Sequence, residues 1–156
     1  MSHTITPAGY EFSPDASRLD ADRVHELLTT HASWAAGRPR AVQDAAVAGS
    51  RNYGIYETAG SAQVAYARVV TDLATFAWLA DVVVDPDHRG RGLARALVAG
   101  ILADLEPFAL RRIVLKASPE GRPIYVRSGW EPVDEPEDWM VLYATGGRPG
   151  ADPAQR

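Results

Sequence analysis

The sequence predicts one α/β (α+β) domain built on a mixed sheet, in which antiparallel and parallel strand pairs occur together. The chain has 156 residues, which suits a single domain with a single core. Short β-rich runs separated by turn residues occupy residues 52–84, a pattern typical of an antiparallel meander. Residues 74–116 then give a strand, a glycine-rich turn, a long helix and a returning strand, an order that implies a parallel pair.

The N-terminal part is expected to hold one short strand and two helices. The strand is predicted at residues 10–12, and Pro14 ends it. Apolar residues recur at helical spacing in residues 20–31, and aspartates lie in the first turn, where the helix dipole favours them. A second helix is predicted at residues 40–48, closed by Gly49.

The middle of the chain is expected to form three consecutive strands, at residues 52–57, 63–70 and 74–84. Tight turns at residues 59–61 and 71–72 connect them. Because such short connections join only antiparallel neighbours, these strands should form a meander.

The C-terminal part begins with the long helix, predicted at residues 93–105, and the returning strand at 112–117. A short helix at 122–127 follows. Two final strands are predicted near residues 130–133 and 139–143, which brings the sheet to seven strands.

Composition narrows the classes of function. The net charge of −4 argues against nucleic acid or an anionic membrane as a partner. The chain has no cysteine, which excludes disulfides and a thiol nucleophile, and no metal is expected. There is no signal-peptide core, and no apolar run approaches the roughly 20 residues that span a bilayer. We expect a cytoplasmic domain over residues 1–144 and a disordered tail over the Gly/Pro/Ala-rich residues 145–156.

The turn between the strand that ends at Asp85 and the helix that starts at Leu93 is the strongest functional signal. The first N–H groups of a helix have no intrahelical partner, so a glycine turn at a helix start is suited to hold an anion. A dinucleotide fingerprint needs a small residue where Arg95 stands, and a P-loop needs a Gly-Lys-Ser/Thr end that is absent. A plain helix start after a glycine-rich turn is the remaining alternative.

Two motifs together resemble the GNAT superfamily of N-acetyltransferases. Residues 89–94, RGRGLA, fit the pattern Arg/Gln-x-x-Gly-x-Gly/Ala after the strand residues 82–86, VVVDP. Residues 124–130, IYVRSGW, are similar to the family's Tyr-x-x-x-Gly-Phe segment, with Trp for Phe. The resemblance spans roughly residues 50–143 and implies a strongly twisted sheet of six to seven strands flanked by about four helices. Residues 118–123 depart from the family pattern, because two prolines and a glycine should shorten the following helix.

The resemblance implies acetyl-CoA as cosubstrate. Its pyrophosphate would meet backbone N–H groups at the helix start, and its peptide-like pantetheine arm would lie between two splayed parallel strands. A main-chain N–H near Val82 or Val83 is a candidate oxyanion donor. The implied cofactor-binding residues are Val82, Val83, Val84, Arg89, Gly90, Arg91, Gly92, Leu93, Ala94, Arg95 and Ser118.

Two residues are the catalytic candidates. By resemblance, Tyr125 is the general acid that protonates the departing thiolate. Asp81 interrupts an apolar strand beside the expected thioester site, where it can act as a base, order water or bind the substrate cation. Since the chain has no cysteine, direct attack of the amine in a ternary complex is the simplest mechanism.

The acceptor is expected to be a small-molecule primary amine. The alternatives are a protein N-terminus or lysine, or an acyl-CoA-binding regulatory module without turnover, and a homodimer is compatible with the sequence. Residues to inspect for acceptor binding are Trp34, Arg38, Arg40, Tyr53, Tyr56, Asp72, Trp78 and Trp139.

Overall fold

One five-stranded mixed sheet organises the chain, in the order β1-β2-β3-β4-β5. The computed structural model describes residues 6–144. The first three strand pairs are antiparallel, and β4 pairs with β5 in parallel, so the predicted mixed sheet is confirmed. The strands are β1 (Tyr10–Ser13), β2 (Arg51–Glu57), β3 (Gln63–Thr71), β4 (Phe76–Val84) and β5 (Arg112–Leu115).

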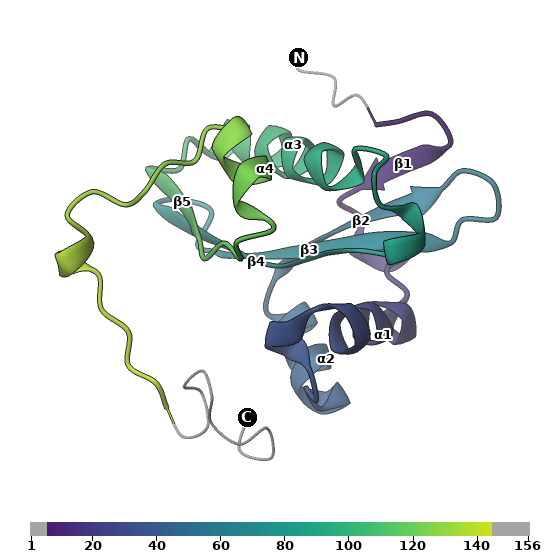
Figure 1. Cartoon of the computed structure of the whole chain (residues 1–156), viewed down its shortest axis with the longest axis horizontal. Helices are drawn as coiled ribbons and strands as arrows, with labels where there is room; N and C mark the ends of the chain where they lie inside the picture. Colours follow the sequence, from purple (N-terminus) through teal and green to yellow (C-terminus); the bar gives the residue numbers. More distant parts are fainter. Residues whose placement is uncertain (1–5, 145–156) are drawn as a thin grey trace.

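Four α-helices cover the two faces of this sheet, α1 and α2 on one face and α3 and α4 on the other (Figure 1). They are α1 (Ala21–His31), α2 (Arg40–Ala48), α3 (Leu93–Leu105) and α4 (Arg122–Arg127). Short 3₁₀ turns lie at η1 (Ala16–Arg18), η2 (Ser33–Ala35), η3 (Pro86–His88), η4 (Glu106–Phe108) and η5 (Pro136–Asp138). The six-residue α4 agrees with the expectation of a shortened helix.

The core consists of two clusters separated by the sheet. Leu97 and Ile101 of α3 pack with Ala65 and other inward residues of β2, β3 and β4. On the opposite face, Leu27 and Leu28 of α1 pack with residues of β3 and β4. Both helices are therefore held by burial of their apolar faces, the main source of helix stability in proteins.

A β-bulge in β4 places Asp81 on the α1 and α2 face. Arg68 of β3 pairs with Ala80, but Tyr66 pairs with Val83, so β4 has one extra residue here. Asp81 takes the left-handed conformation at φ 56, which aspartate tolerates better than most residues. The bulge shifts the alternation of side chains, which makes Asp81 point away from the α3 cluster.

The predicted strands at residues 130–133 and 139–143 are wrong: within residues 6–144 the sheet has five strands rather than six or seven. Pro132 lacks the N–H that a paired strand would donate. The indole N–H of Trp130 instead donates to the Ile113 carbonyl of β5 at 2.9 Å. Beyond Pro136–Asp138 the chain runs away from the sheet (Figure 1), so residues 139–143 have no neighbouring strand.

Two strand ends differ from the prediction by two residues, and the others agree to within one. The strand expected from residue 74 begins at Phe76, because the Asp72 carboxylate accepts the N–H groups of Ala74, Thr75 and Phe76 and prolongs the turn. The strand expected to reach residue 117 ends at Leu115. The tail predicted at residues 145–156 lies outside the described residues. Among residues 6–144, no helix combines the length and the apolar character needed to cross a membrane.

Candidate active site

Strand β4 continues beyond the end of β5. Their ladder runs from the Phe76–Arg112 pair to the Leu79–Leu115 pair, where β5 ends, while β4 continues to Val84. The β4 segment after Leu79 therefore has no β5 partner in the described ladder. This leaves a strand edge that can accept a peptide-like ligand.

Backbone alternation identifies the β4 groups that face this edge. The Asp85 N–H donates to the Val64 carbonyl of β3 at 2.8 Å. Successive residues of a strand direct their N–H and C=O groups to alternate sides, so those of Val82 and Val84 are directed away from β3. Their side chains pack against the α3 cluster, whereas Val83 packs against the α1 cluster. The side chains thus belong to the core and only the backbone is available to a ligand.

The start of α3 is an uncapped helix N-terminus. Gly92 is the N-cap residue at φ 78, without a side-chain hydrogen bond to the helix. The first intrahelical bond is from the Ala96 N–H to the Gly92 carbonyl, 3.0 Å, which leaves the earlier N–H groups of the helix without intrahelical partners. Gly90 has φ 73, and no atom lies within 4 Å of the position its Cβ would take. The space beside Gly90 is therefore open.

The predicted basic residues flank this turn. Arg89, Arg91 and Arg95 are all exposed. Arg91 donates from Nη1 to the Tyr10 hydroxyl at 2.7 Å, and that hydroxyl lies 2.8 Å from Nδ1 of His88. No sequence signal places Tyr10 at this turn, because this residue comes from β1, 81 positions before Arg91.

Tyr125 lies on α4, on the same face of the sheet as α3 (Figure 1). Its ring is half-buried and meets Trp130 edge to face, with the centroids 5.8 Å apart. Among residues 6–144 no protein group is hydrogen-bonded to its hydroxyl. Burial raises the pKa of Tyr125, so its phenol stays protonated throughout the physiological range.

Ser118 forms hydrogen bonds at the start of α4. Its Oγ accepts the Gly121 N–H at 3.2 Å, and its carbonyl accepts the Arg122 N–H at 3.0 Å. Ser118, which the sequence predicts as a cofactor-binding residue, therefore stabilises the turn between β5 and α4.

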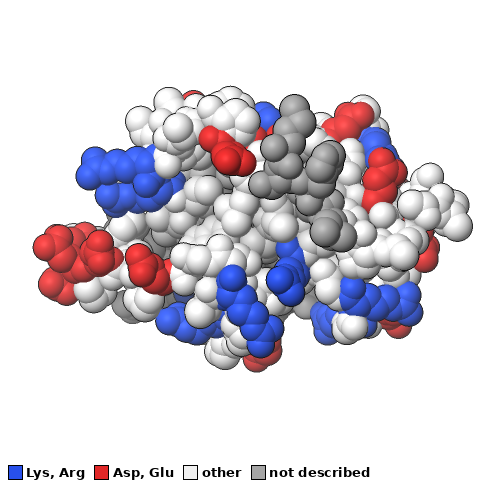
Figure 2. Space-filling view, turned by 90° about the horizontal axis from the view of Figure 1, so that it is seen from above, with Lys and Arg blue, Asp and Glu red and all other residues white. Residues whose placement is uncertain are grey.

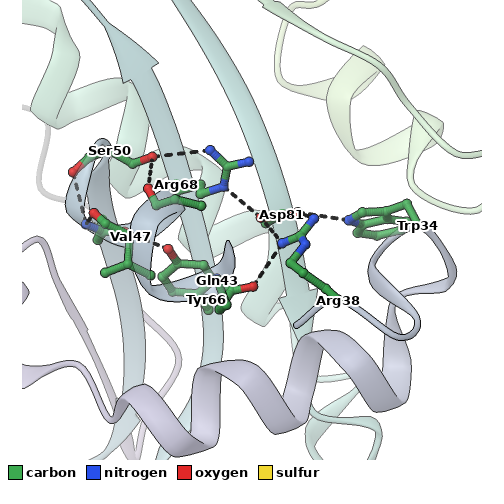
Figure 3. Close-up of polar contacts among 10 residues, drawn as sticks. Trp34, Arg38, Gln43, Val47, Ser50, Tyr66, Arg68 and Asp81 are labelled. Atoms are coloured by element: carbon green, nitrogen blue, oxygen red, sulfur yellow. Dashed lines mark hydrogen bonds and ion pairs between the residues drawn. The ribbon is translucent and has the colours of Figure 1, made fainter. Parts of the chain in front are cut away.

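Asp81 is the centre of a buried ion cluster on the α1 and α2 face (Figure 3). Its side chain is 2% exposed, and Oδ2 lies 2.7 Å from Nη1 of Arg38 and 2.7 Å from Nε of Arg68. The indole N–H of Trp34 donates to Oδ1 at 3.0 Å. Burial opposes the charge of Asp81, but the hydrogen bonds from the two guanidinium groups outweigh it and lower its pKa. The carboxylate is therefore held ionised.

The cluster continues into neighbouring elements (Figure 3). Arg38 also donates to Oε1 of Gln43 at 2.9 Å, and Nε2 of that buried amide has no partner among the described residues. Arg68 reaches Oγ of Ser50 at 3.2 Å. Trp34 and Arg38 are among the residues that the sequence suggests for acceptor binding, but Arg68 is not. Its signal was an arginine in the otherwise apolar run of β3, the strand next to the one that carries Asp81.

The other residues inspected for acceptor binding lie elsewhere. Tyr53 and Tyr56 are buried in the core, and Arg40 pairs with Asp22 and Asp44 at the surface. Asp72 forms the β3–β4 turn.

Comparison with known proteins agrees with this geometry. The model of the acetyltransferase (GNAT) domain matches residues 38–139. A search of curated proteins gave no match.

Three solved structures illustrate the similarity. A protein of Xanthomonas campestris pv. campestris assigned to the GNAT family is 36% identical, with a TM-score of 0.81 over 89% of this chain and 96% of that chain. Rv2747 of Mycobacterium tuberculosis, solved in complex with CoA, is 16% identical, with a TM-score of 0.66 over 80% and 73% of the two chains. A protein of Clostridium acetobutylicum solved with acetyl-CoA is 18% identical, with a TM-score of 0.64 over 86% and 94%. The last two share the fold, and the domain match and the first structure carry the assignment: the chain belongs to the GNAT family of acetyltransferases and is an acyltransferase.

Proposed function

We propose that this enzyme transfers an acetyl group from acetyl-CoA to the primary amine of a small molecule, by direct attack in a ternary complex. The observation that carries the proposal is the β4 backbone that continues beyond the end of β5, followed in the chain by the uncapped start of α3. A backbone edge and an anion-binding turn then lie in succession along one stretch of chain, as a ligand with a peptide-like arm and a pyrophosphate requires.

The α3 start is the proposed pyrophosphate site. Gly90 and Gly92 both have positive φ, and the space beside Gly90 is empty, so the phosphates can approach the backbone closely. Arg89, Arg91 and Arg95 add positive charge around this turn. The backbone N–H groups of Leu93 and Ala94 complete the site together with the helix dipole.

The free edge of β4 is the proposed pantetheine site. The backbone groups of Val82 and Val84 face away from β3 and can bond the amides of the arm. Acetyl-CoA supplies the acetyl group in activated form, as a thioester. The Val82 main-chain N–H would polarise its carbonyl, whereas the Val83 N–H is directed toward β3. Ser118 Oγ accepts the Gly121 N–H and keeps its own O–H free to donate to the arm.

Tyr125 is the proposed general acid. As the amine nitrogen bonds to the carbonyl carbon and the carbon–sulfur bond breaks, its hydroxyl gives a proton to the sulfur. The products are an amide and free CoA thiol, and the phenolate recovers a proton from the water that takes the amine's proton. Support comes from a hydroxyl with no protein partner among residues 6–144 and a pKa raised by burial, which keeps the proton available.

Asp81 is proposed as a positioning residue rather than the base. A carboxylate bonded by Arg38 and Arg68, with a lowered pKa, is a weak proton acceptor. The same contacts fix the β4 bulge, from which the edge backbone at Val82 takes its direction. In the pH–rate profile of Asp81→Asn, we expect a lower kcat but an acid limb at the wild-type pH, whereas loss of that limb would identify Asp81 as the base.

A thiol-release assay tests the proposed reaction. The protein is mixed with acetyl-CoA and a panel of small amines, amino acids and lysine peptides, and free thiol is followed with a disulfide reagent. The chain adds no thiol background because it lacks cysteine. Release that depends on a small amine supports the proposal. Release only with peptides points to a protein acetyltransferase, and tight acetyl-CoA binding without release on any acceptor points to a regulatory module.

A further inference from the structure

The buried ion cluster around Asp81 carries more positive than negative charge. Arg38 and Arg68 both bond to this one carboxylate, and among residues 6–144 neither arginine forms an ion pair with another acidic side chain. Figure 2 shows the side of the molecule covered by α3 and α4, where acidic and basic side chains are exposed to water. The Asp81 cluster lies on the opposite face of the sheet and is mostly buried, so its extra positive charge calls for an anion.

The cluster also has more hydrogen-bond donors than acceptors. Among the described residues, Nε of Arg38 and Nη2 of Arg68 have no acceptor. The buried Gln43 amide accepts from Arg38 through Oε1, and its Nε2 likewise has no partner in the described part of the chain. Guanidinium groups and amide nitrogens only donate. A carboxylate would supply acceptor oxygens and a negative charge together, in a shape that matches the guanidinium fork.

An exposed apolar strip lies beside Arg68 on the same face of the sheet. Val70 and Trp78 face each other across β3 and β4. Arg68 lies two residues before Val70, and because side chains alternate along a strand, both project from the α1 and α2 face. Val70 is 44% exposed and Trp78 38%, while the side chain of Arg68 is 18% exposed. A small molecule that reaches the guanidinium from solvent can therefore also place an apolar group on this strip.

The cluster adjoins the proposed acetyl site through the chain itself. Asp81 directly precedes Val82, whose N–H is proposed to polarise the thioester carbonyl. Consecutive Cα atoms lie about 3.8 Å apart. A group bound by the two arginines that contact Asp81 would therefore lie within the length of one small molecule from the reacting carbonyl carbon.

We infer that the acceptor is an amino acid with an apolar side chain, whose carboxylate binds Arg38 and Arg68. The inference rests on the proposed acetyl transfer, because that reaction requires the amine as the third group of the ligand. The carboxylate balances the charge of the cluster, the side chain lies on Val70 and Trp78, and the amine faces the carbonyl held at Val82. The products are then an N-acetyl amino acid and free CoA.

Matched acceptors test the role of the carboxylate in the thiol-release assay. Leucine and phenylalanine are each compared with their carboxamide and with the amine that lacks the carboxyl group. We expect kcat/KM to be about 10- to 100-fold higher for the amino acid, because either analogue loses charge-assisted hydrogen bonds. The amine of the carboxamide loses its proton more readily at neutral pH, so basicity does not explain a preference for the amino acid over it. Equal rates with amino acids and analogues would overturn the inference.

Arg68→Met tests the arginine with the same acceptors. The substitution removes the extra positive charge and leaves Arg38 paired with Asp81. We expect the ratio of kcat/KM for leucine to that for leucinamide to fall at least about tenfold, whereas general damage to the fold would lower both values and leave the ratio unchanged. Arg40→Met is the matched control, because Arg40 forms its ion pairs at the surface of α2, and it should keep the wild-type ratio. An Arg68→Met variant with the wild-type ratio would refute the site.

Binding without turnover separates this inference from the proposed reaction. Calorimetry measures the affinity of leucine and of leucinamide for the protein saturated with CoA. If no amine releases thiol, but leucine binds more tightly than leucinamide to the wild type and not to Arg68→Met, the carboxylate site stands and the transfer reaction fails. If amines without a carboxyl group release thiol and leucine shows no tighter binding, the transfer reaction stands and the carboxylate site fails.

Discussion

Asp81→Asn is the substitution that tests most directly whether the buried ion cluster around Asp81 stabilises the fold. It removes one negative charge with almost no change in shape, and it leaves Arg38 and Arg68 facing each other in a buried place. Asparagine adopts the left-handed conformation as readily as aspartate, so the φ of 56 at this position adds no strain. The substitution therefore removes the charge without changing the backbone conformation.

The cost follows from burial. The side chain of Asp81 is 2% exposed, and those of Arg38 and Arg68 are 17% and 18% exposed. Removal of one partner from a buried ion pair costs about 3–5 kcal/mol, because the remaining charge is left without compensation. Because both guanidinium groups keep some contact with water, we expect a loss of stability near the lower end of this range, about 3 kcal/mol.

Urea unfolding at neutral pH measures this loss, with Asp44→Asn as the matched control. Asp44 pairs with Arg40 at the surface, with its side chain 55% exposed, so the same substitution should cost less than about 0.5 kcal/mol there. Because folding lowers the pKa of Asp81, its contribution is full above the ordinary aspartate pKa of about 3.9. This contribution to stability should be lost as the pH falls through the pKa that Asp81 has in the folded protein. If Asp81→Asn costs no more than Asp44→Asn, the cluster does not stabilise the fold and the reasoning fails.

Three further substitutions test other parts of the account. Gly100→Ala would place a methyl group 2.5 Å from the Phe12 ring, so it should lower the free energy of unfolding by about 1–3 kcal/mol in urea titrations, despite the better helix propensity of alanine. Gly92→Ala forces alanine to φ 78 at the α3 start, so calorimetry should show acetyl-CoA affinity about tenfold weaker or more; an unchanged affinity would remove the phosphate site from this turn. Tyr53→Phe deletes the 2.6 Å hydrogen bond to Asp104 and should cost about 1–3 kcal/mol by thermal unfolding, with no change in acetyl-CoA affinity.

The helices could be predicted from the sequence because their signals are local. Apolar spacing in α1, the closing Gly49 after α2 and the glycine turn before α3 each act within a few residues. The parallel β4–β5 pair was predictable because few topologies are possible for a strand, a helix and a strand that follow one another in the chain.

The Asp81 cluster and the number of strands were not predictable in this way. Arg38 lies 43 positions before Asp81, and Trp34 lies 47 before it, so only the folded α1–α2 region brings them together. The bulge that turns Asp81 toward them is a property of β3–β4 register rather than of either strand alone. Residues 139–143 have the composition of a strand, but a strand also needs a partner edge, which composition does not reveal.

The measurement that tests the central claim most directly is the turnover of Tyr125→Phe in the thiol-release assay, with acetyl-CoA affinity measured separately by calorimetry. The variant keeps the ring that packs on Trp130 and loses only the proton donor. We predict a kcat about 100-fold lower or more, with acetyl-CoA affinity close to wild type. Tyr56→Phe, which removes a buried hydroxyl without a partner in the described chain, should turn over like wild type. A Tyr125→Phe enzyme with wild-type kcat, or one impaired only through weaker acetyl-CoA binding, would contradict the role of Tyr125 as the general acid.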